Sequence, residues 1–314
     1  MERVTRPEGE GGSLIERAAR RYDFDAYLRR PEAGADPAPA APEPALAGIP
    51  AEFLSSGTYE DFTPPPADPT VASVDRGMLA ERGMIVPGAP VGPLAEEFRL
   101  VKRHVLGRMR LIAESDRAER ARVALVCSAR PGDGKTFCAI NLALSVAAER
   151  DVRALLIDAD FAKPDVCRQL GLPDGRGLLD ALEDASVDPE TLVVETDVPG
   201  LSVLPTGAKT AADTELLASA RTRHVIARLL AADPHRVILF DSPPALAASP
   251  AAVLATLVGQ VLLVVRADRT AEGELREAVG LLDGCEHIQL LLNAVSFVPG
   301  GRRFGDYYGQ EMGK

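Results

Sequence analysis

Six short apolar runs, separated by segments with helical spacing, dominate the pattern of the chain beyond about residue 94. They are VALVCS (123–128), RALLID (153–158), LSVLP (201–205), RVILFD (236–241), QVLLVV (260–265) and IQLLLN (288–293). The runs are continuous rather than alternating, as expected of strands buried on both faces of a parallel sheet. We therefore predict a doubly wound α/β domain over 94–298, with a mostly parallel sheet and helices on both faces.

Two further segments have helical spacing before the first strand. In SLIERAARRYDFDAYLRR (13–30), apolar residues gather on one side and Ser13 with Glu16 forms a capping-box pattern. We expect a short docking helix there, within an N-terminal segment over 1–30. LAEEFRLVKRHVLGRMRLI (94–112) predicts a basic amphipathic helix that opens the α/β domain.

Between these helices lies a segment rich in proline and acidic residues. Residues 31–50 hold six prolines, and 31–95 hold nine acidic against two basic side chains. Proline removes backbone donors and like charges repel, so we predict a disordered, extended linker over 31–93. The polar end of the chain, 299–314, predicts a flexible tail that carries two tyrosines.

Composition narrows the classes of function. The formal net charge is −11, which argues against a nucleic-acid partner. The four cysteines lack metal-ligand spacing and are expected to be small buried residues in a reducing compartment. We expect no signal peptide, because MERVTRPEGEGG has no apolar stretch, and no transmembrane span, because the longest apolar run (253–265) is too short. A cytoplasmic location follows as the expectation.

A phosphate-binding pattern follows the first predicted strand. SARPGDGKTF (128–137) lies between that strand and an apolar helix pattern, the context that a P-loop requires. Gly132 and Gly134 let the backbone wrap closely around phosphates at a helix N-terminus. Lys135 is expected to reach the β- and γ-phosphates, and the Thr136 hydroxyl is expected to hold Mg²⁺. The sequence thus predicts a P-loop NTPase that binds ATP and Mg²⁺, although Ala129 replaces the usual first glycine.

Carboxylates end two further strands. Asp158 and Asp160 are two residues apart at a strand end, so both can face one metal or one incoming hydroxyl. Asp241 ends another strand, where an acid would hold Mg²⁺ through water. We therefore predict Lys135, Asp158 and Asp160 as catalytic. The predicted metal site comprises Thr136, Asp158, Asp160 and Asp241.

Asn293 is the last residue of the last predicted strand, and two roles for its side chain are open. Its amide could contact the edge of adenine, or it could cap the strand. Hydrolase triads find no support, because the GxSxG pattern is missing. The glycine-rich flap, HRD and DFG motifs of eukaryotic protein kinases are missing as well.

The order of motifs resembles that of the bacterial tyrosine kinases of exopolysaccharide synthesis. The motifs are EEFRLVKR, PGDGKTFCAINLA, LLIDADFAKP, LFDSPP, LLLNAV and a tyrosine tail. The resemblance covers about 94–296. Within the family the chain is most similar to the tyrosine autokinases encoded with exosortase (PEP-CTERM) loci.

The resemblance implies a role for each matching position. The predicted ATP contacts are Arg130, Pro131, Gly132, Asp133, Gly134, Lys135, Thr136, Phe137 and Asn293. EEFR (96–99) resembles a helix through which subunits assemble into rings, which implies a homo-oligomer. Tyr307 and Tyr308 fall where the family keeps its autophosphorylated tyrosines. The family works beside an inner-membrane polysaccharide chain-length determinant, which implies such a protein as activator and a peripheral membrane location.

Two departures from the family pattern accompany the match. Ala162, followed by Lys163, replaces the arginine of the broad family, as is common in the exosortase-associated subgroup. The tail has two tyrosines where many relatives have more. Two rival readings remain: an ATPase switch of the chromosome-partition or division-site type, disfavoured by Arg130 at its early lysine position, and a nucleotide-gated scaffold for polysaccharide export.

Overall fold

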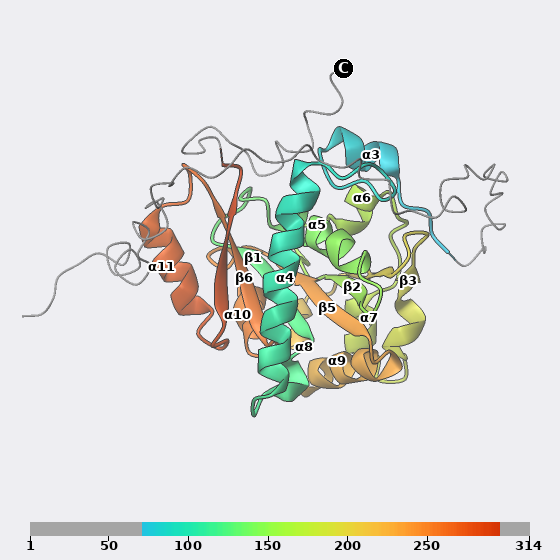
Figure 1. Ribbon diagram of the computed structural model, residues 1–314. Coiled ribbons are helices and arrows are strands. Elements are labelled where there is room, and N and C mark those ends of the chain that lie inside the picture. The colour runs from blue at the N-terminus through green and yellow to red at the C-terminus, as the bar shows by residue number, and fades with distance from the viewer. Residues whose placement is uncertain (1–70, 296–314) are drawn as a thin grey trace, which may run out of the picture. The chain divides into compact units, whose positions relative to one another are not determined.

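The fold is built on a seven-stranded sheet with the order β3-β4-β2-β5-β1-β6-β7 (Figure 1). The computed structural model describes residues 71–295. The strands are β1 (Val123–Ser128), β2 (Arg153–Asp158), β3 (Val194–Glu195), β4 (Leu201–Leu204), β5 (Arg236–Asp241), β6 (Gln260–Arg266) and β7 (Ile288–Asn293). Among the strands of residues 71–295, β3 alone pairs antiparallel, with β4. The predicted α/β fold with a mostly parallel sheet is confirmed, and β3 is an addition that the sequence did not predict.

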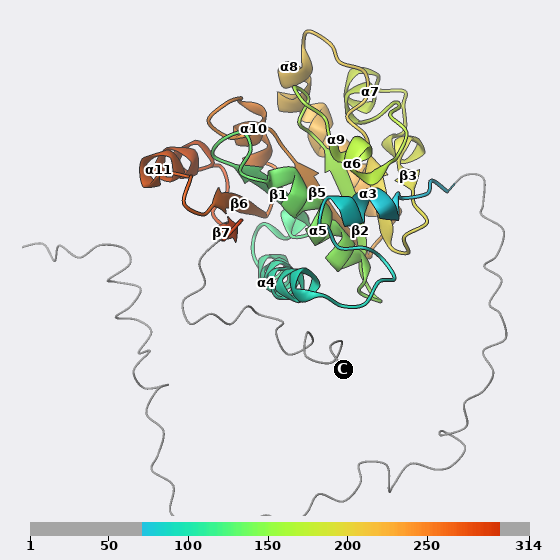
Figure 2. The same cartoon turned by 90° about the horizontal axis from the view of Figure 1, so that it is seen from above.

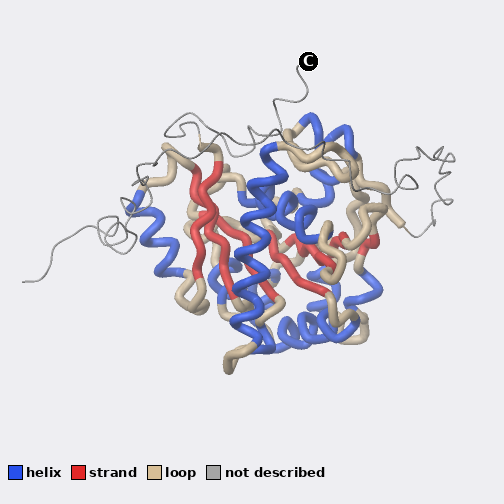
Figure 3. The backbone as a smooth tube through the Cα atoms, viewed as in Figure 1, coloured by secondary structure: helices blue, strands red, loops and turns tan. Residues whose placement is uncertain are grey.

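Helices cover both faces of the sheet (Figures 2 and 3). One face is packed by α3 (Arg76–Glu81), α4 (Pro93–Ala113), α5 (Lys135–Ala147) and α6 (Val166–Leu170). The other is packed by α7 (Leu178–Glu183), α8 (Asp213–Ala218), α9 (Ala220–Ala232), α10 (Pro250–Ala255) and α11 (Glu272–Leu281). Short 3₁₀ turns within residues 71–295 are η2 (Ala118–Arg120) and η3 (Pro189–Leu192). Within residues 71–295, none of these helices combines the length and apolar character that crossing a membrane requires.

The continuous apolar runs arise because successive strand residues enter two different cores. In β1, Val123 and Leu125 pack with α7–α11, whereas Ala124 and Val126 pack with α3–α6. All six residues of β1 are buried, since side chains alternate between faces and both faces are covered. The four cysteines are free and buried, as predicted.

The last predicted strand departs from this pattern. β7 lies at the edge of the sheet, and residues Leu290 and Leu292 are each 59% exposed. Burial on both faces was therefore a wrong prediction for β7. A continuous apolar run does not distinguish a central strand from an edge strand that is covered on one face.

The predicted linker over 31–93 is wrong for residues 71–92. This segment contains α3, and Val74, Leu79 and Met84 are buried against α4–α6. Asp75 caps α3 by accepting the Met78 amide. The physical reason is that 71–86 contains no proline, so its spaced apolar residues can pack although the flanking composition resembles a linker. The predicted helix at 13–30 and the tail at 299–314 lie outside the described residues.

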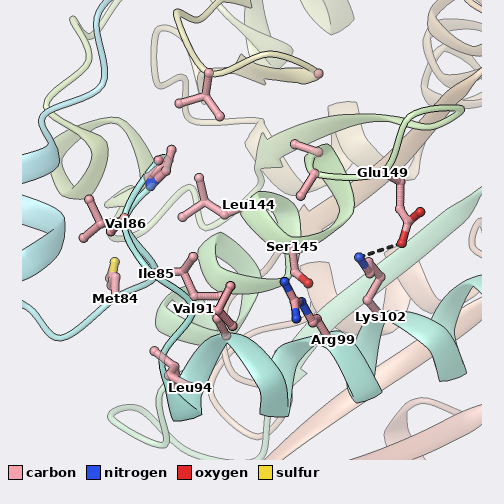
Figure 4. Close-up of a pocket in the computed structure, with 18 of the residues that line it drawn as sticks. Met84, Ile85, Val86, Val91, Leu94, Arg99, Lys102, Leu144, Ser145 and Glu149 are labelled. Carbon is pink, nitrogen blue, oxygen red and sulfur yellow. Dashed lines mark ion pairs between the residues drawn. The ribbon is translucent and has the colours of Figure 1, made fainter. Parts of the chain in front are cut away.

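A cavity of about 920 Å³ lies between this packed segment, α4 and the end of α5 (Figure 4). Met84 and Leu144 line it, and Lys102 forms an ion pair with Glu149 at 2.6 Å on its border. No residue of 128–137 lines the cavity. It is therefore separate from the predicted phosphate site.

Replacing Leu79 with Ala tests whether 71–92 is part of the folded domain. Leu79 is fully buried, so the truncation should lower the free energy of unfolding by about 2–5 kcal/mol. Denaturant titration measures the change. The matched control is Leu111→Ala on α4, where the side chain is 59% exposed and a change within about 0.5 kcal/mol is expected. Equal, small effects of both substitutions would contradict the packing of this segment.

Candidate functional site

Polar side chains meet where the central parallel strands end. Asp158 ends β2 and Asp241 ends β5, and the two residues are register partners. The P-loop leaves the end of β1, which pairs with β5 on one side and β6 on the other. Ligands of open α/β sheets bind at such carboxyl ends. The structure therefore brings the three predicted motifs to one edge of the sheet.

The P-loop has the backbone geometry that its glycines allow. Gly132 has φ +85° and Gly134 has φ +98°, in the left-handed region that side chains disfavour. Lys135 is the first residue of α5, a helix of 13 residues. The loop thus delivers its backbone to a helix N-terminus, where the N–H groups and the helix dipole favour an anion.

Lys135 and Thr136 contact the strand-end acids directly. The Lys135 ammonium donates to Asp160 at 2.7 Å and lies 3.9 Å from Asp241. The Thr136 hydroxyl donates to Asp241 Oδ2 at 2.7 Å. All four side chains are largely or fully withdrawn from solvent. Lysine, hydroxyl and two carboxylates therefore form one connected cluster.

Burial and charge pull the ionisation of this cluster in opposite directions. Burial raises the pKa of Asp241 to about 7, although the Lys135 ammonium and the Thr136 hydroxyl act to lower it. For Lys135 burial lowers the pKa, but Asp241 and Asp160 outweigh burial and leave the pKa above its usual value. Lys135 is thus held as a cation by the carboxylates around it.

One buried carboxylate oxygen of the cluster is available to bind Mg²⁺. Asp241 Oδ1 is fully buried and has no hydrogen-bond partner in the described part of the chain. Such an oxygen is costly unless a ligand or cation satisfies it. Residues 71–295 contain no group of three His, Cys, Asp or Glu side chains arranged to hold a metal. Mg²⁺ commonly uses one or two carboxylates together with phosphates and water.

Asp158 is placed differently from Asp160. Its Oδ1 accepts the Asp160 amide, and its Oδ2 accepts the amides of Asp165 and Val166 at 2.9 and 3.0 Å. Asp158 thereby anchors the start of α6, and burial raises its pKa against these bonds. The two carboxylates do not converge on one point here, so their catalytic and metal roles stay predictions.

The remaining predicted contacts are scattered around the loop. Arg130 is exposed and pairs with Glu274 at 2.8 Å. The buried Asp133 carboxylate accepts the Arg130 amide within the loop. Phe137 packs against the α3–α6 core rather than lying free in the loop. Pro131 is exposed. Tyr307 and Tyr308 lie outside the described residues.

Asn293 and one unpredicted residue, Arg266, hold the loop from the side. The Asn293 amide donates to the Asp133 carbonyl at 2.9 Å, and contact with adenine stays a prediction. Arg266, the last residue of β6, donates to the Gly132 carbonyl at 2.8 Å. The sequence signal for Arg266 was available, since a basic residue directly follows the apolar run QVLLVV.

Curated proteins with similar sequences are tyrosine-protein kinases. No protein-family model matches the chain. The chain is 36% identical over 188 residues to the putative tyrosine-protein kinase EpsB of Ralstonia nicotianae, covering 59% of this chain and 24% of EpsB. It is 29% identical to the tyrosine-protein kinase YwqD of Bacillus subtilis, covering 68% of this chain and 85% of YwqD. The chain thus spans about a quarter of the length of EpsB.

Solved structures agree with these sequence relatives. The kinase domain of VpsO superposes with a TM-score of 0.51 at 30% identity, covering 63% of this chain and 97% of that domain. The tyrosine kinase domain of BceF superposes with a TM-score of 0.53 at 30% identity, covering 62% and 76%. Sequence and structure therefore point to the same group of proteins.

The raised pKa of Asp241 predicts a pH dependence of stability without nucleotide or Mg²⁺. Between about pH 4 and 7 the folded state binds more protons at this residue than the unfolded state, so its contribution falls as pH rises through that window. Asp241→Asn keeps an acceptor for Thr136 and removes this titration. We expect the variant to gain on the order of 1–3 kcal/mol relative to the parent protein between pH 5 and 8. Denaturant titrations across this range measure the difference, and parallel pH profiles would contradict the prediction.

Proposed function

Because the chain belongs to the bacterial tyrosine kinase family, we propose that it is an ATP-dependent protein-tyrosine autokinase. The observation that carries the proposal is the cluster at the strand ends. At the N-terminus of α5, Lys135 is hydrogen-bonded to Asp160, and Thr136 is hydrogen-bonded to Asp241. Phosphoryl transfer needs a cation, a metal site and a carboxylate close together, since its catalysis is mostly positioning and electrostatic stabilisation.

Different residues of the cluster bind the metal ion, bind the phosphates and neutralise their charge. Mg²⁺, when bound with ATP, supplies positive charge beside the transferring phosphoryl group. Thr136 and the unsatisfied Asp241 oxygen would hold that ion. The P-loop backbone binds the phosphates, and Lys135 leaves Asp160 to neutralise charge on the γ-phosphate. This exchange frees the Asp160 carboxylate.

Asp160 then serves as the base for the incoming tyrosine. As the tyrosine oxygen bonds to the γ-phosphorus and ADP leaves, the hydroxyl proton passes to Asp160. A free phenol has a pKa of about 10, so a nearby base helps at neutral pH. Asp158 is the weaker candidate, since three backbone amides already occupy its oxygens. Its contribution is to hold the start of α6 in place.

The proposed substrates are Tyr307 and Tyr308 of a neighbouring subunit. By likeness to the family, the helix that carries EEFR (96–99) mediates assembly, and the tail of one subunit enters the site of the next. Each phosphate adds up to about two negative charges. Phosphates on adjacent tyrosines repel each other and the acidic site, which favours dissociation of the assembly.

The proposed setting is exopolysaccharide synthesis at the inner membrane. The chain would work in the cytoplasm, beside a membrane protein that determines polysaccharide chain length and activates the kinase. Membership of the exosortase-associated subgroup rests on the motif pattern, including Ala162 and Lys163, and stays a prediction.

Lys135→Met tests the proposed activity. The variant loses the cation that contacts the phosphates, so phosphate on Tyr307 and Tyr308 should be present in the parent protein and fall at least a hundredfold in the variant. Intact-mass and peptide mass spectrometry after incubation with Mg·ATP measure both sites. Arg276→Met, which removes an exposed cation on α11, should leave phosphorylation unchanged.

A mixture of two variants tests transfer between subunits. Lys135→Met with an intact tail is mixed with an active subunit that carries Tyr307→Phe and Tyr308→Phe. Phosphate should appear on the tail of the inactive subunit. Phosphotyrosine that is missing from the parent protein, with only free phosphate released, would contradict the kinase and favour an ATPase switch.

A further inference from the structure

Two side chains, from the ends of β6 and β7, reach the P-loop backbone at consecutive peptide units. Arg266 Nη1 donates to the Gly132 carbonyl at 2.8 Å, and Asn293 Nδ2 donates to the Asp133 carbonyl at 2.9 Å. Arg266 and Asn293 end β6 and β7 and are register partners. Two neighbouring strand ends therefore hold two successive carbonyls of the loop.

These contacts determine where the loop amides point. In a trans peptide unit the carbonyl and the following N–H point in opposite directions. A carbonyl held towards β6 and β7 directs the N–H groups of Asp133 and Gly134 towards the opposite, concave side of the loop. Successive N–H groups on a concave side form an anion-binding nest. We propose that Arg266 and Asn293 are positioning residues, which orient this nest for the phosphates of ATP; this rests on the proposed function.

The surrounding backbone supports the arrangement. The Arg266 amide donates to the Thr270 hydroxyl at 3.0 Å, and the Ala267 amide donates to the Asn293 carbonyl at 2.9 Å. These bonds fix the bases of the two side chains. A Cβ atom at Gly134 would lie 2.1 Å from Asn293 Nδ2. Glycine at this position is thus required for the amide to reach the loop as well as for the positive φ.

A third carbonyl of the loop is held from within. The Ser128 hydroxyl donates to the Arg130 carbonyl at 2.8 Å. Three loop carbonyls, those of Arg130, Gly132 and Asp133, are thus bonded to side chains from the ends of β1, β6 and β7. The end of β1 and the ends of the two strands next to it on one side, β6 and β7, therefore hold the loop in shape.

Substitutions at Arg266 separate a positioning role from direct charge contact with phosphate. Arg266→Gln keeps a donor without the charge, and Arg266→Met keeps the apolar stem without the donor. Loss of a charge-assisted hydrogen bond should weaken binding of Mg·ADP about tenfold to a hundredfold in Arg266→Met. Arg266→Gln should recover most of that loss. Arg276→Met is the control, since it removes an exposed arginine of α11 that pairs only with Glu272 in the described contacts.

Asn293→Leu separates positioning from contact with adenine. Leucine keeps the side-chain shape and removes the amide donor. Positioning predicts that the affinities for Mg·ADP and for magnesium tripolyphosphate, which has no base, fall by a similar factor. Contact with adenine alone predicts that only the affinity for the nucleotide falls.

Displacement of a fluorescent ADP analogue from the full chain measures all these affinities, and thermal unfolding shows that each variant is folded. Unchanged affinity in folded Arg266→Met would overturn the proposal for Arg266, and recovery by Lys but not by Gln at position 266 would assign direct charge contact instead.

If the parent protein binds Mg·ADP but makes no phosphotyrosine, the proposed kinase fails while the positioning proposal is still tested. If the parent protein binds no nucleotide, both fail.

Discussion

A buried ammonium group held among carboxylates is the constraint on which the rest of the site depends. Only 12% of the Lys135 side chain is exposed, so burial alone would drive it towards its neutral form. Asp160 at 2.7 Å and Asp241 at 3.9 Å keep it charged. The carboxylates can do so because parallel strands end at one edge of the sheet, and α5 begins at that edge. The order of the strands in the sheet thus determines which charged side chains lie next to Lys135.

The same arrangement leaves unsatisfied groups that a ligand would satisfy. Asp241 is fully buried, its pKa is raised to about 7, and its Oδ1 has no hydrogen-bond partner within residues 71–295. A compact domain retains such groups where function requires them. Mg·ATP would supply a cation for Asp241 and anions for Lys135 and the loop amides. The same buried charged groups that destabilise the nucleotide-free protein therefore also provide its affinity for nucleotide.

The sequence was sufficient for the parts of this structure that depend on local pattern. Continuous apolar runs predicted six of the seven strands: the largely buried β1, β2, β4, β5 and β6, and the edge strand β7. Gly132, Gly134 and Lys135 identified the P-loop because its backbone geometry demands glycine. The pattern could not give facts that depend on contacts between distant segments. Examples are the exposure of Leu290 at the sheet edge and the packing of Leu79. Asp158 and Asp160 looked equivalent by spacing, but Asp158 accepts the amides at the start of α6, whereas Asp160 pairs with Lys135.

The most direct measurement is the position of the Lys135 ammonium in a crystal structure of the full chain with Mg²⁺ and a non-hydrolysable ATP analogue. We predict that Lys135 leaves Asp160 and contacts the β- and γ-phosphates, while Thr136 and Asp241 lie beside the metal. The Asp160 carboxylate would then be free to face an incoming tyrosine hydroxyl. A nucleotide complex in which Lys135 is still hydrogen-bonded to Asp160, away from the phosphates, would contradict this mechanism.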